Sequence, residues 1–357
     1  MSETPKSSKT MRSVLGFPLY FLQIFSGAKS FEKNPLLGSH FLNARNLHVM
    51  RVSLAMRMAG LRRRLLRSHI SAQQAEAYER DGYVRIDDFL PEEQFQQLLE
   101  EMHGSEFERV DMHQGSTITR RSMIDDQDLL SRPALRQARD SQQLKNLVQY
   151  VGSHAGQALV TLQTVLAKSQ GTPDPQSDLH SDTFHATAKA WLFLTEVGED
   201  DGPFCYVAGS HRMTPQRYAW EKAISTSLDS VENTYSRRGS LRVSPDKLAE
   251  LGYPPPTRMV VKPNTLIVAD THGFHARCAS PVDTTRIEIY ASLRRGPYLP
   301  FVARSLGGLH LGALPFVKGR INRLVVSGLH RMQKLGLRGC PWQSIGQGKV
   351  DEWTHKP

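Results

Sequence analysis

The sequence has few cysteines, and they are not arranged to cross-link a fold or bind zinc. In 357 residues there are three, Cys205, Cys278 and Cys340, far apart and without C-x-x-C spacing. An odd number of dispersed cysteines indicates neither a disulfide framework nor a zinc-thiolate site. We therefore expect a protein of a reducing compartment, the cytoplasm.

A long apolar run is also missing from the N-terminal part. The run VLGFPLYFLQIF (14–25) has 12 residues, contains Pro18 and is not followed by a small-residue cleavage site. A helix needs ~20 apolar residues to cross a bilayer, and a secretory signal ends in such a cleavage site. We expect neither feature here.

Acidic residues are nearly absent from both ends. Residues 1–70 hold 12 Lys/Arg and 2 Asp/Glu, residues 294–357 hold 11 and 2, and the residues between them hold 22 and 31. A nucleic-acid enzyme usually gathers its positive charge around its site, so we expect no nucleic-acid partner, and no protein partner is indicated. Basic ends are typical of surface-docking segments. An anionic membrane, at its inner face, is the partner we expect for them.

The N-terminal end contains a predicted helix over 46–68 with two interpretations. Its apolar residues recur at steps of three or four, with arginines between them. The helix either packs against its own domain or lies as a basic interfacial helix on anionic lipid. We assign 1–69 and 299–357 as basic amphipathic extensions. The apolar stripe consists of Leu47, Met50, Leu54, Met58, Leu61 and Leu65.

Between these extensions, residues 70–298 change from a helical to a strand-like pattern. Residues 70–150 are predicted to be mainly helical: a capped helix follows Ser71 to Gly82, YVRIDDFL alternates like a strand, and a helix follows Pro91. Residues 157–298 contain short strand-like runs separated by turn residues, among them ALVTLQTVLAK, AKAWLFLTEV, NTLIVAD and RIEIYASL. This pattern favours a sandwich or barrel, mainly β with flanking helices.

The stretch DLHSDTFH places His180 and Asp182 two residues apart. On a strand such residues project to one face, but a pair of this kind also arises by chance. A non-haem iron site needs a second histidine as its third ligand. Downstream candidates are His211, His272 and His275. Because His275 and Arg286 lie eleven residues apart across a turn, an antiparallel return could bring the arginine beside the metal.

Taken together, these residues resemble the phytanoyl-CoA dioxygenase family of Fe(II)- and 2-oxoglutarate-dependent oxygenases. The family pattern is His-x-Asp, a distal histidine some ninety residues later and an arginine eleven beyond it. Here His275 follows His180 by 95 residues and Arg286 follows by eleven. The segments AYERDGYVRIDDFLPEEQ and AWLFLTEVGEDDGPFCYVAGSHR are also similar to the family. The resemblance covers about 70–298.

The resemblance implies a double-stranded β-helix, a cupin-like jelly roll. It implies His180, Asp182 and His275 as iron ligands, with 2-oxoglutarate and O2 as co-substrates. The expected reaction hydroxylates an aliphatic carbon of a small or lipid-linked metabolite and decarboxylates 2-oxoglutarate to succinate and CO2. The planar fork of Arg286 suits the far carboxylate of 2-oxoglutarate, and Trp191 matches the family's tryptophan beside the cofactor pocket. An aspartate at 182 argues against a halogenating relative.

Further polar residues are candidates at the same site. Lys168, at the end of a strand before the loop to His180, is a cofactor-binding candidate. Arg120, Arg121 and His185 are substrate candidates, against the alternative of solvated surface residues. His211 is expected to support a turn and His272 to donate a hydrogen bond behind the ligands.

Two other functions compete with this interpretation. One is a non-catalytic β-sandwich that binds a ligand or lipid and keeps a vestigial metal site. The other is a zinc hydrolase using His180 and His185, whose spacing differs from H-E-x-x-H. The sequence leaves open the substrate, the carbon attacked, the choice among hydroxylation, desaturation and cyclisation, and the oligomeric state.

Overall fold

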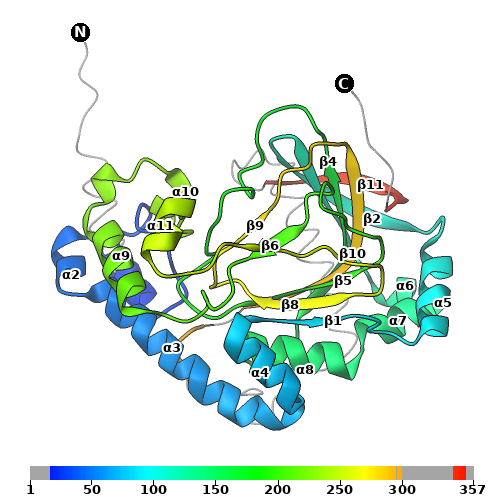
Figure 1. Cartoon of the computed structure of the whole chain (residues 1–357), viewed down its shortest axis with the longest axis horizontal. Helices are drawn as coiled ribbons and strands as arrows, with labels where there is room; N and C mark the ends of the chain where they lie inside the picture. The colour runs from blue at the N-terminus through cyan, green and yellow to red at the C-terminus, as the bar shows by residue number, and fades with distance from the viewer. Residues whose placement is uncertain (1–16, 295, 300–340, 351–357) are drawn as a thin grey trace.

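The protein is built around two antiparallel sheets (Figure 1). The computed structural model describes residues 17–294, 296–299 and 341–350. The large sheet has the order β1-β8-β5-β10-β4-β3-β2-β11, and the small sheet has the order β7-β6-β9. The strands are β1 (Tyr83–Ile86), β2 (Glu106–Gln114), β3 (Thr117–Ser122), β4 (Leu159–Ala167), β5 (Ala188–Phe193), β6 (Phe204–Tyr206), β7 (Thr257–Arg258), β8 (Leu266–Asp270), β9 (His275–Arg277), β10 (Thr284–Leu293) and β11 (Trp342–Lys349).

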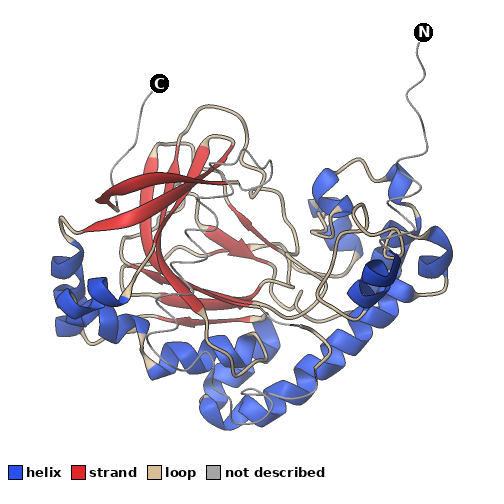
Figure 2. Ribbon diagram, turned by 180° about the vertical axis from the view of Figure 1, so that it is seen from behind, coloured by secondary structure: helices blue, strands red, loops and turns tan. Residues whose placement is uncertain are grey.

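Helices cover one face of the large sheet and one end of the molecule (Figure 2). Residues 17–24 are also helical. The others are α2 (His40–Ala44), α3 (Leu47–Leu66), α4 (Ala72–Asp81), α5 (Glu92–Met102), α6 (Asp126–Ser131), α7 (Pro133–Arg139), α8 (Gln142–Val151), α9 (Pro215–Thr226), α10 (Thr234–Arg237) and α11 (Pro245–Glu250), with short 3-10 turns at Arg67–His69 and Leu228–Ser230.

The chain crosses between the sheets as a jelly roll does. It leaves β4 of the large sheet, forms a bridge at His180 beside β9 of the small sheet, and returns to β5. It then crosses to β6 and β7, back to β8, over to β9 and back to β10. The predicted fold class, mainly β with a jelly-roll core and flanking helices, is confirmed.

The period-two alternation of the strands separates two apolar cores. On β10, Ile287 and Ile289 belong to the core between the large sheet and the helices, whereas Tyr290 belongs to the core between the two sheets. Trp191 and Phe204 also lie in this inner core. On each strand, the side chains that do not face the helices therefore point between the two sheets, into the jelly roll, where a site can be built.

The segment after α3 follows the sequence prediction closely until α5. Ser71 caps α4 with a capping box to Gln74, and Gly82 ends that helix at φ 89°. Within the range predicted to be helical, however, 106–122 forms the hairpin β2–β3 and extends the large sheet. Its sequence alternates in exposure, and Gly115 has the positive φ, 62°, that its turn requires.

Helix α3 packs against the domain with the face opposite to its apolar stripe. Its buried residues are His48, Arg51, Val52, Ala55, Ala59, Arg62 and Leu66. Met50 and Leu65 of the predicted stripe are 65% and 64% exposed, and Leu54 and Leu61 are exposed as well. Small alanines let α3 approach α8 and α9. The helix is thus part of the domain, but the stripe expected to bury it faces outward.

The predicted C-terminal extension lies largely outside the described residues, as do residues 1–16. Its described part, 341–350, adds β11 to the edge of the large sheet beside β2. Every helix in the described ranges is too short or too polar to cross a bilayer.

Candidate metal centre

The loop after β4 brings His180 and Asp182 to the small sheet. His180 and His275 exchange two backbone hydrogen bonds, each with an N–O distance of 2.9 Å. The amide of Asp182 donates to the carbonyl of Thr271, also at 2.9 Å. These bonds fix the two-residue step, so the side chains of His180 and Asp182 project toward the same space.

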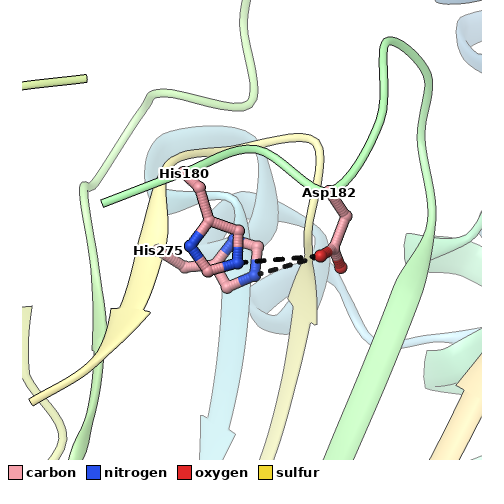
Figure 3. Close-up of side chains that lie close together, drawn as sticks. All are labelled: His180, Asp182 and His275. Atoms are coloured by element: carbon pink, nitrogen blue, oxygen red, sulfur yellow. Dashed lines mark ion pairs between the residues drawn. The ribbon is translucent and has the colours of Figure 1, made fainter. Parts of the chain in front are cut away.

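His180, Asp182 and His275 bring their ligand atoms within 4.8 Å of one another. Each histidine Nε2 is 3.8 Å from Oδ1 of Asp182, and both rings point toward that carboxylate (Figure 3). Two imidazoles and one carboxylate on one side of a cation are the ligands of a non-haem iron site with open positions.

Backbone carbonyls orient both imidazole rings. Nδ1 of His180 is 2.7 Å from the carbonyl oxygen of Asp178, and Nδ1 of His275 is 2.9 Å from that of Gly273. A ring nitrogen facing a carbonyl carries the proton, which leaves Nε2 as a lone-pair donor to a metal. Nε2 of His275 is buried and has no hydrogen-bond partner. The residues present therefore fit an iron ion.

The electrostatics keep the three ligands in their metal-binding forms at neutral pH. Burial lowers the pKa of His275 to about 4. Burial, and next the unfavourable interaction that two protonated rings would have, holds the pKa of His180 well below its ordinary value. Burial alone would raise the pKa of Asp182, but Lys189 and the two histidines outweigh it and hold that pKa well below the usual range. Protons therefore compete weakly with a cation here.

Two lysines that are not among the sequence-predicted site residues contact Asp182. Lys189 of β5 places Nζ 2.6 Å from Oδ2, so Oδ1 remains directed at the histidines. Lys29, in the segment before α2, donates from Nζ to the backbone carbonyl of Asp182. Lys189 shares a strand face with Trp191 and could have been found from that alternation, whereas no local pattern singles out Lys29.

Arg286 points into the jelly roll from β10, on the same strand face as Tyr290. Its Nη1 donates to the carbonyl of Gly202 at 2.8 Å, and its Nε is 2.9 Å from Oε2 of the buried Glu288. Arg277, two residues beyond His275 on β9, interacts electrostatically with Arg286. Arg286 therefore lies inside the same jelly roll as the metal ligands, on the opposite sheet from His275.

Trp191 and Lys168 have contrasting positions. Trp191 is buried in the inner core, with its ring 4.5 Å from that of Phe204, whose ring is 5.9 Å from that of His275. Lys168 is exposed at the end of β4, where it lines a cavity of about 230 Å³ together with Gly202 and Arg277. Gly202 also accepts a hydrogen bond from Arg286, so Lys168 lies near the part of the jelly roll that holds Arg286.

The adjacent substrate candidates Arg120 and Arg121 point to opposite faces of β3. Arg120 forms a buried two-point ion pair with Asp111, at 2.9 and 3.0 Å, and its side chain is 0% exposed. Arg121 stacks over the ring of Tyr290, 3.9 Å from its centroid, and interacts with Lys189. Arg121 therefore faces the site, whereas the charge of Arg120 is neutralised by Asp111 away from it.

His185 is buried against the N-terminal segment rather than exposed on the surface. Its Nδ1 is 3.0 Å from the carbonyl of Ala186, and its Nε2 is 3.4 Å from where a Cβ on Gly27 would lie. That Nε2 has no hydrogen-bond partner. Burial lowers its pKa to about 3, so the ring is neutral.

His272 and His211 do not join the ligand group. Nδ1 of His272 is 2.9 Å from the carbonyl of Thr183, next to Asp182, so this histidine anchors the loop carrying the ligand. His211 is buried in the turn after β6, with its ring 5.0 Å from that of Tyr78. These positions agree with supporting roles.

Asp270, at the end of β8, connects the N-terminal helices to the loops of the site. Its Oδ2 accepts from Arg63 of α3 and from Tyr78 of α4, both at 2.9 Å. Its Oδ1 accepts from the amides of Thr187 and His272, both at 3.1 Å. No local pattern singles out Asp270, because its partners lie up to 207 residues away.

The fold and the ligand group define a jelly-roll protein with a mononuclear non-haem metal centre. Residues 78–241 match the family model of phytanoyl-CoA dioxygenase (PhyH). The resemblance recognised in the sequence is confirmed. Iron, 2-oxoglutarate and O2 are the cofactor and co-substrates of this class, and the His-Asp-His group supplies the required ligand types.

Solved structures with low similarity to the chain include three metal- or 2-oxoglutarate-related proteins. The epimerase SnoN in complex with Fe3+, alpha ketoglutarate and nogalamycin RO is 17% identical, covers 68% of this chain and 91% of its own, and has a TM-score of 0.39. HygX from Streptomyces hygroscopicus with nickel and 2-oxoglutarate is 14% identical, covers 68% and 93%, and scores 0.39. The carbocyclase SnoK from nogalamycin biosynthesis is 18% identical, covers 64% and 84%, and scores 0.37. No curated protein matches the chain.

Proposed function

We propose that the protein is an Fe(II)- and 2-oxoglutarate-dependent dioxygenase that hydroxylates an aliphatic carbon of a small or lipid-linked metabolite. The observation that carries this proposal is the His180, Asp182 and His275 group, with both imidazoles oriented by carbonyls so that Nε2 faces the carboxylate. When bound, iron with 2-oxoglutarate and O2 supplies the oxidation.

The protein's own side chains have distinct tasks in this proposal. The three ligands hold the metal on one side and leave the other side for the co-substrates. Lys189 binds the second oxygen of Asp182 and holds that carboxylate ionised and oriented. Arg286, whose position Glu288 and Gly202 fix, offers its remaining N–H groups to the far carboxylate of 2-oxoglutarate. Trp191 and Phe204 exclude water from the interior.

The test is 2-oxoglutarate turnover by the purified full chain with Fe(II) and ascorbate. The wild type should release succinate and CO2, and His180→Ala and Asp182→Ala should abolish the release and the bound metal. The matched control is His69→Ala, an exposed histidine beyond the C-terminal end of α3. A metal-free, inactive wild type would favour the non-catalytic β-sandwich, and turnover that persists in both ligand variants would reject the assignment.

We also propose that α3 docks the enzyme on an anionic membrane surface. Its outward stripe, Met50, Leu54, Leu61 and Leu65, is exposed, with Met58 half-buried between them. Arg57 and Arg64 are exposed three residues beyond Leu54 and Leu61, on the edge of this stripe. Residues 33–75 contain eight Lys/Arg and no Asp/Glu. An apolar stripe edged only by cations matches an anionic lipid headgroup layer.

Sedimentation with vesicles tests this docking. The protein should bind vesicles rich in phosphatidylglycerol, bind less at high salt, and not bind phosphatidylcholine vesicles. Leu54→Ser with Leu61→Ser should remove binding, whereas Leu130→Ser, an exposed leucine on α6, should not. Equal partitioning to neutral vesicles, no partitioning, or concentration-dependent dimerisation through the stripe would overturn the proposal.

A further inference from the structure

The N-terminal segment before α2 forms part of the wall of the metal centre. Arg51 of α3 donates to the carbonyls of Ile24, Ser26 and Ala28, at 2.9, 3.0 and 2.7 Å, and fixes that segment in place. Lys29, the next residue, then reaches Asp182. This wall lies outside the 78–241 range of the family match.

The jelly roll and the loops beside it contribute further cations next to this wall. Lys189 of β5 and Arg121 of β3 point inward beside Tyr290. The backbone of Arg242 forms an isolated β-bridge with that of His180, and the Arg242 charge interacts with the His180 ring. Arg294, just after β10, donates to the carbonyl of Gly27 at 3.3 Å and interacts with Lys29.

These five side chains, Lys29, Arg121, Lys189, Arg242 and Arg294, form the cationic mouth of the site. The acids that interact with Lys29, Lys189 and Arg242 are Asp182 and Asp178. Lys29, Lys189 and Arg242 therefore share two carboxylates, one of which is a metal ligand. A bound metal would add further positive charge. A surplus of this size in a partly buried site calls for an anionic ligand.

Two guanidinium groups of the mouth have unused hydrogen-bonding capacity. Nε of Arg121 and Nε of Arg242 are buried and lack a hydrogen-bond partner. The Arg121 plane is held by Tyr290 on one side and lies 5.3 Å from the ring of Trp342. A guanidinium held flat by aromatic rings presents its N–H groups in a fixed direction, as oxyanion recognition requires.

We propose that the cationic mouth binds a phosphate-type oxyanion of the substrate and so positions the carbon to be oxidised at the metal. This inference rests on the proposed function for the identity of the site, and it names the substrate class. The surplus of positive charge favours a doubly charged group. A soluble phosphomonoester and a phosphate headgroup in a membrane share this chemistry, and the experiment separates them.

Binding is measured without turnover, on the full chain, by calorimetric titration with inorganic phosphate and with glycerol 3-phosphate. A parallel series uses vesicles containing phosphatidic acid. Lys29→Gln, Arg121→Gln and Arg294→Gln should each weaken phosphate binding by about tenfold, because each removes one charge-assisted hydrogen bond. Arg136→Gln, an exposed arginine of α7 outside both the mouth and the α3 stripe, is the matched control and should bind like the wild type.

The outcomes separate the possible ligands. Loss of soluble phosphate binding in the variants indicates a soluble substrate, and loss of only vesicle binding indicates a lipid headgroup. The proposal is overturned if phosphate binds the variants and the wild type equally, if neither probe binds, or if 2-oxoglutarate displaces phosphate competitively. Competition would mean that these cations bind the co-substrate.

Failure of this inference is distinct from failure of the proposed function. If phosphate binding depends on the mouth but the protein neither turns over 2-oxoglutarate nor retains metal, the dioxygenase assignment fails and the anion site stands. If 2-oxoglutarate turnover is normal and phosphate binding is absent, the dioxygenase assignment stands and the anion site fails. Arg294→Gln is the variant least able to disturb folding, because Arg294 is exposed.

Discussion

The jelly-roll interior and helix α3 position their charged side chains in different ways. In the jelly roll, strand alternation sets Lys189 and Arg286 on the inner face, where aromatic residues and a few acids surround them. In α3, Arg51 and Arg62 are buried because irregular backbone needs donors, while Met50 and Leu65 face outward. Strand alternation therefore accounts for which residues point inward, whereas the apolar stripe of the helix did not identify its buried face.

The physical difference is the partner that each region offers. The interior of the jelly roll has regular backbone with paired amides, so its charges bind other side chains or a ligand. In the segments beside α3, several carbonyls accept from an arginine side chain rather than from a backbone amide. They include those of Ile24, Ala28 and Ser153. An arginine that satisfies several carbonyls can be buried at a modest cost, because each bond offsets the loss of hydration.

The largest effect is expected at the metal ligands. Asp182→Ala removes the carboxylate that both imidazoles face and leaves Lys189 without its ion-pair partner. We expect complete loss of bound iron and of 2-oxoglutarate turnover, measured by elemental analysis and succinate release. Asp178→Ala is the control, because His180 uses the backbone carbonyl of Asp178 rather than its side chain. Iron retained by Asp182→Ala would contradict the ligand assignment.

The buried arginine of α3 should have the next largest effect. Arg51→Leu leaves three carbonyls without their donor, and the free energy of unfolding should fall by about 3 kcal/mol. Urea denaturation measures the change. Arg57→Leu, six residues along the same helix and exposed, should change it by less than about 0.5 kcal/mol. Equal effects of the two variants would show that the buried contacts do not stabilise the fold.

A pH dependence should come from the histidines buried in their neutral forms. Burial lowers the pKa of His185 and His211 to about 3 and that of His272 to about 4. Because these values lie below about 6.5 in the unfolded chain, the unfolded state takes up protons first. Their contribution to stability is complete above pH 6.5 and is lost as the pH falls toward 4.

Each such histidine changes the free energy of unfolding by about 1.4 kcal/mol per pH unit in that window. Urea denaturation at pH 7.5, 6 and 5 measures the slope. His211→Gln should flatten it, whereas His69→Gln, at an exposed position, should leave it unchanged. A slope that is the same in all three proteins would contradict the assignment of His211.

The smallest effect on stability is expected on the outer face of α3. Leu65→Ser changes an exposed side chain, so the free energy of unfolding should change by less than about 0.5 kcal/mol. The same variant should bind anionic vesicles more weakly. Thermal denaturation and vesicle sedimentation together check this pair of results, and a strongly destabilised variant would show that the stripe is covered in the folded protein.

The jelly roll and its ligands could be predicted from the sequence because their signals are local or evenly spaced. The strand runs, the His-x-Asp pair and the step from His275 to Arg286 are visible within short segments. Lys29 could not be predicted, because its partner Asp182 is 153 residues away. Arg120 and Arg121 are indistinguishable until the pairing of β2 with β3 sets which one meets Asp111.

The attachment of Lys29 through Arg51 separates two properties of the enzyme that could change independently. Oxidising power resides in the strands and loops that hold the metal, whereas part of the entrance belongs to a segment encoded upstream of the family domain. A relative with a different leading segment could accept another compound on an unchanged catalytic frame. Grafting that segment would then be a practical way to redirect selectivity.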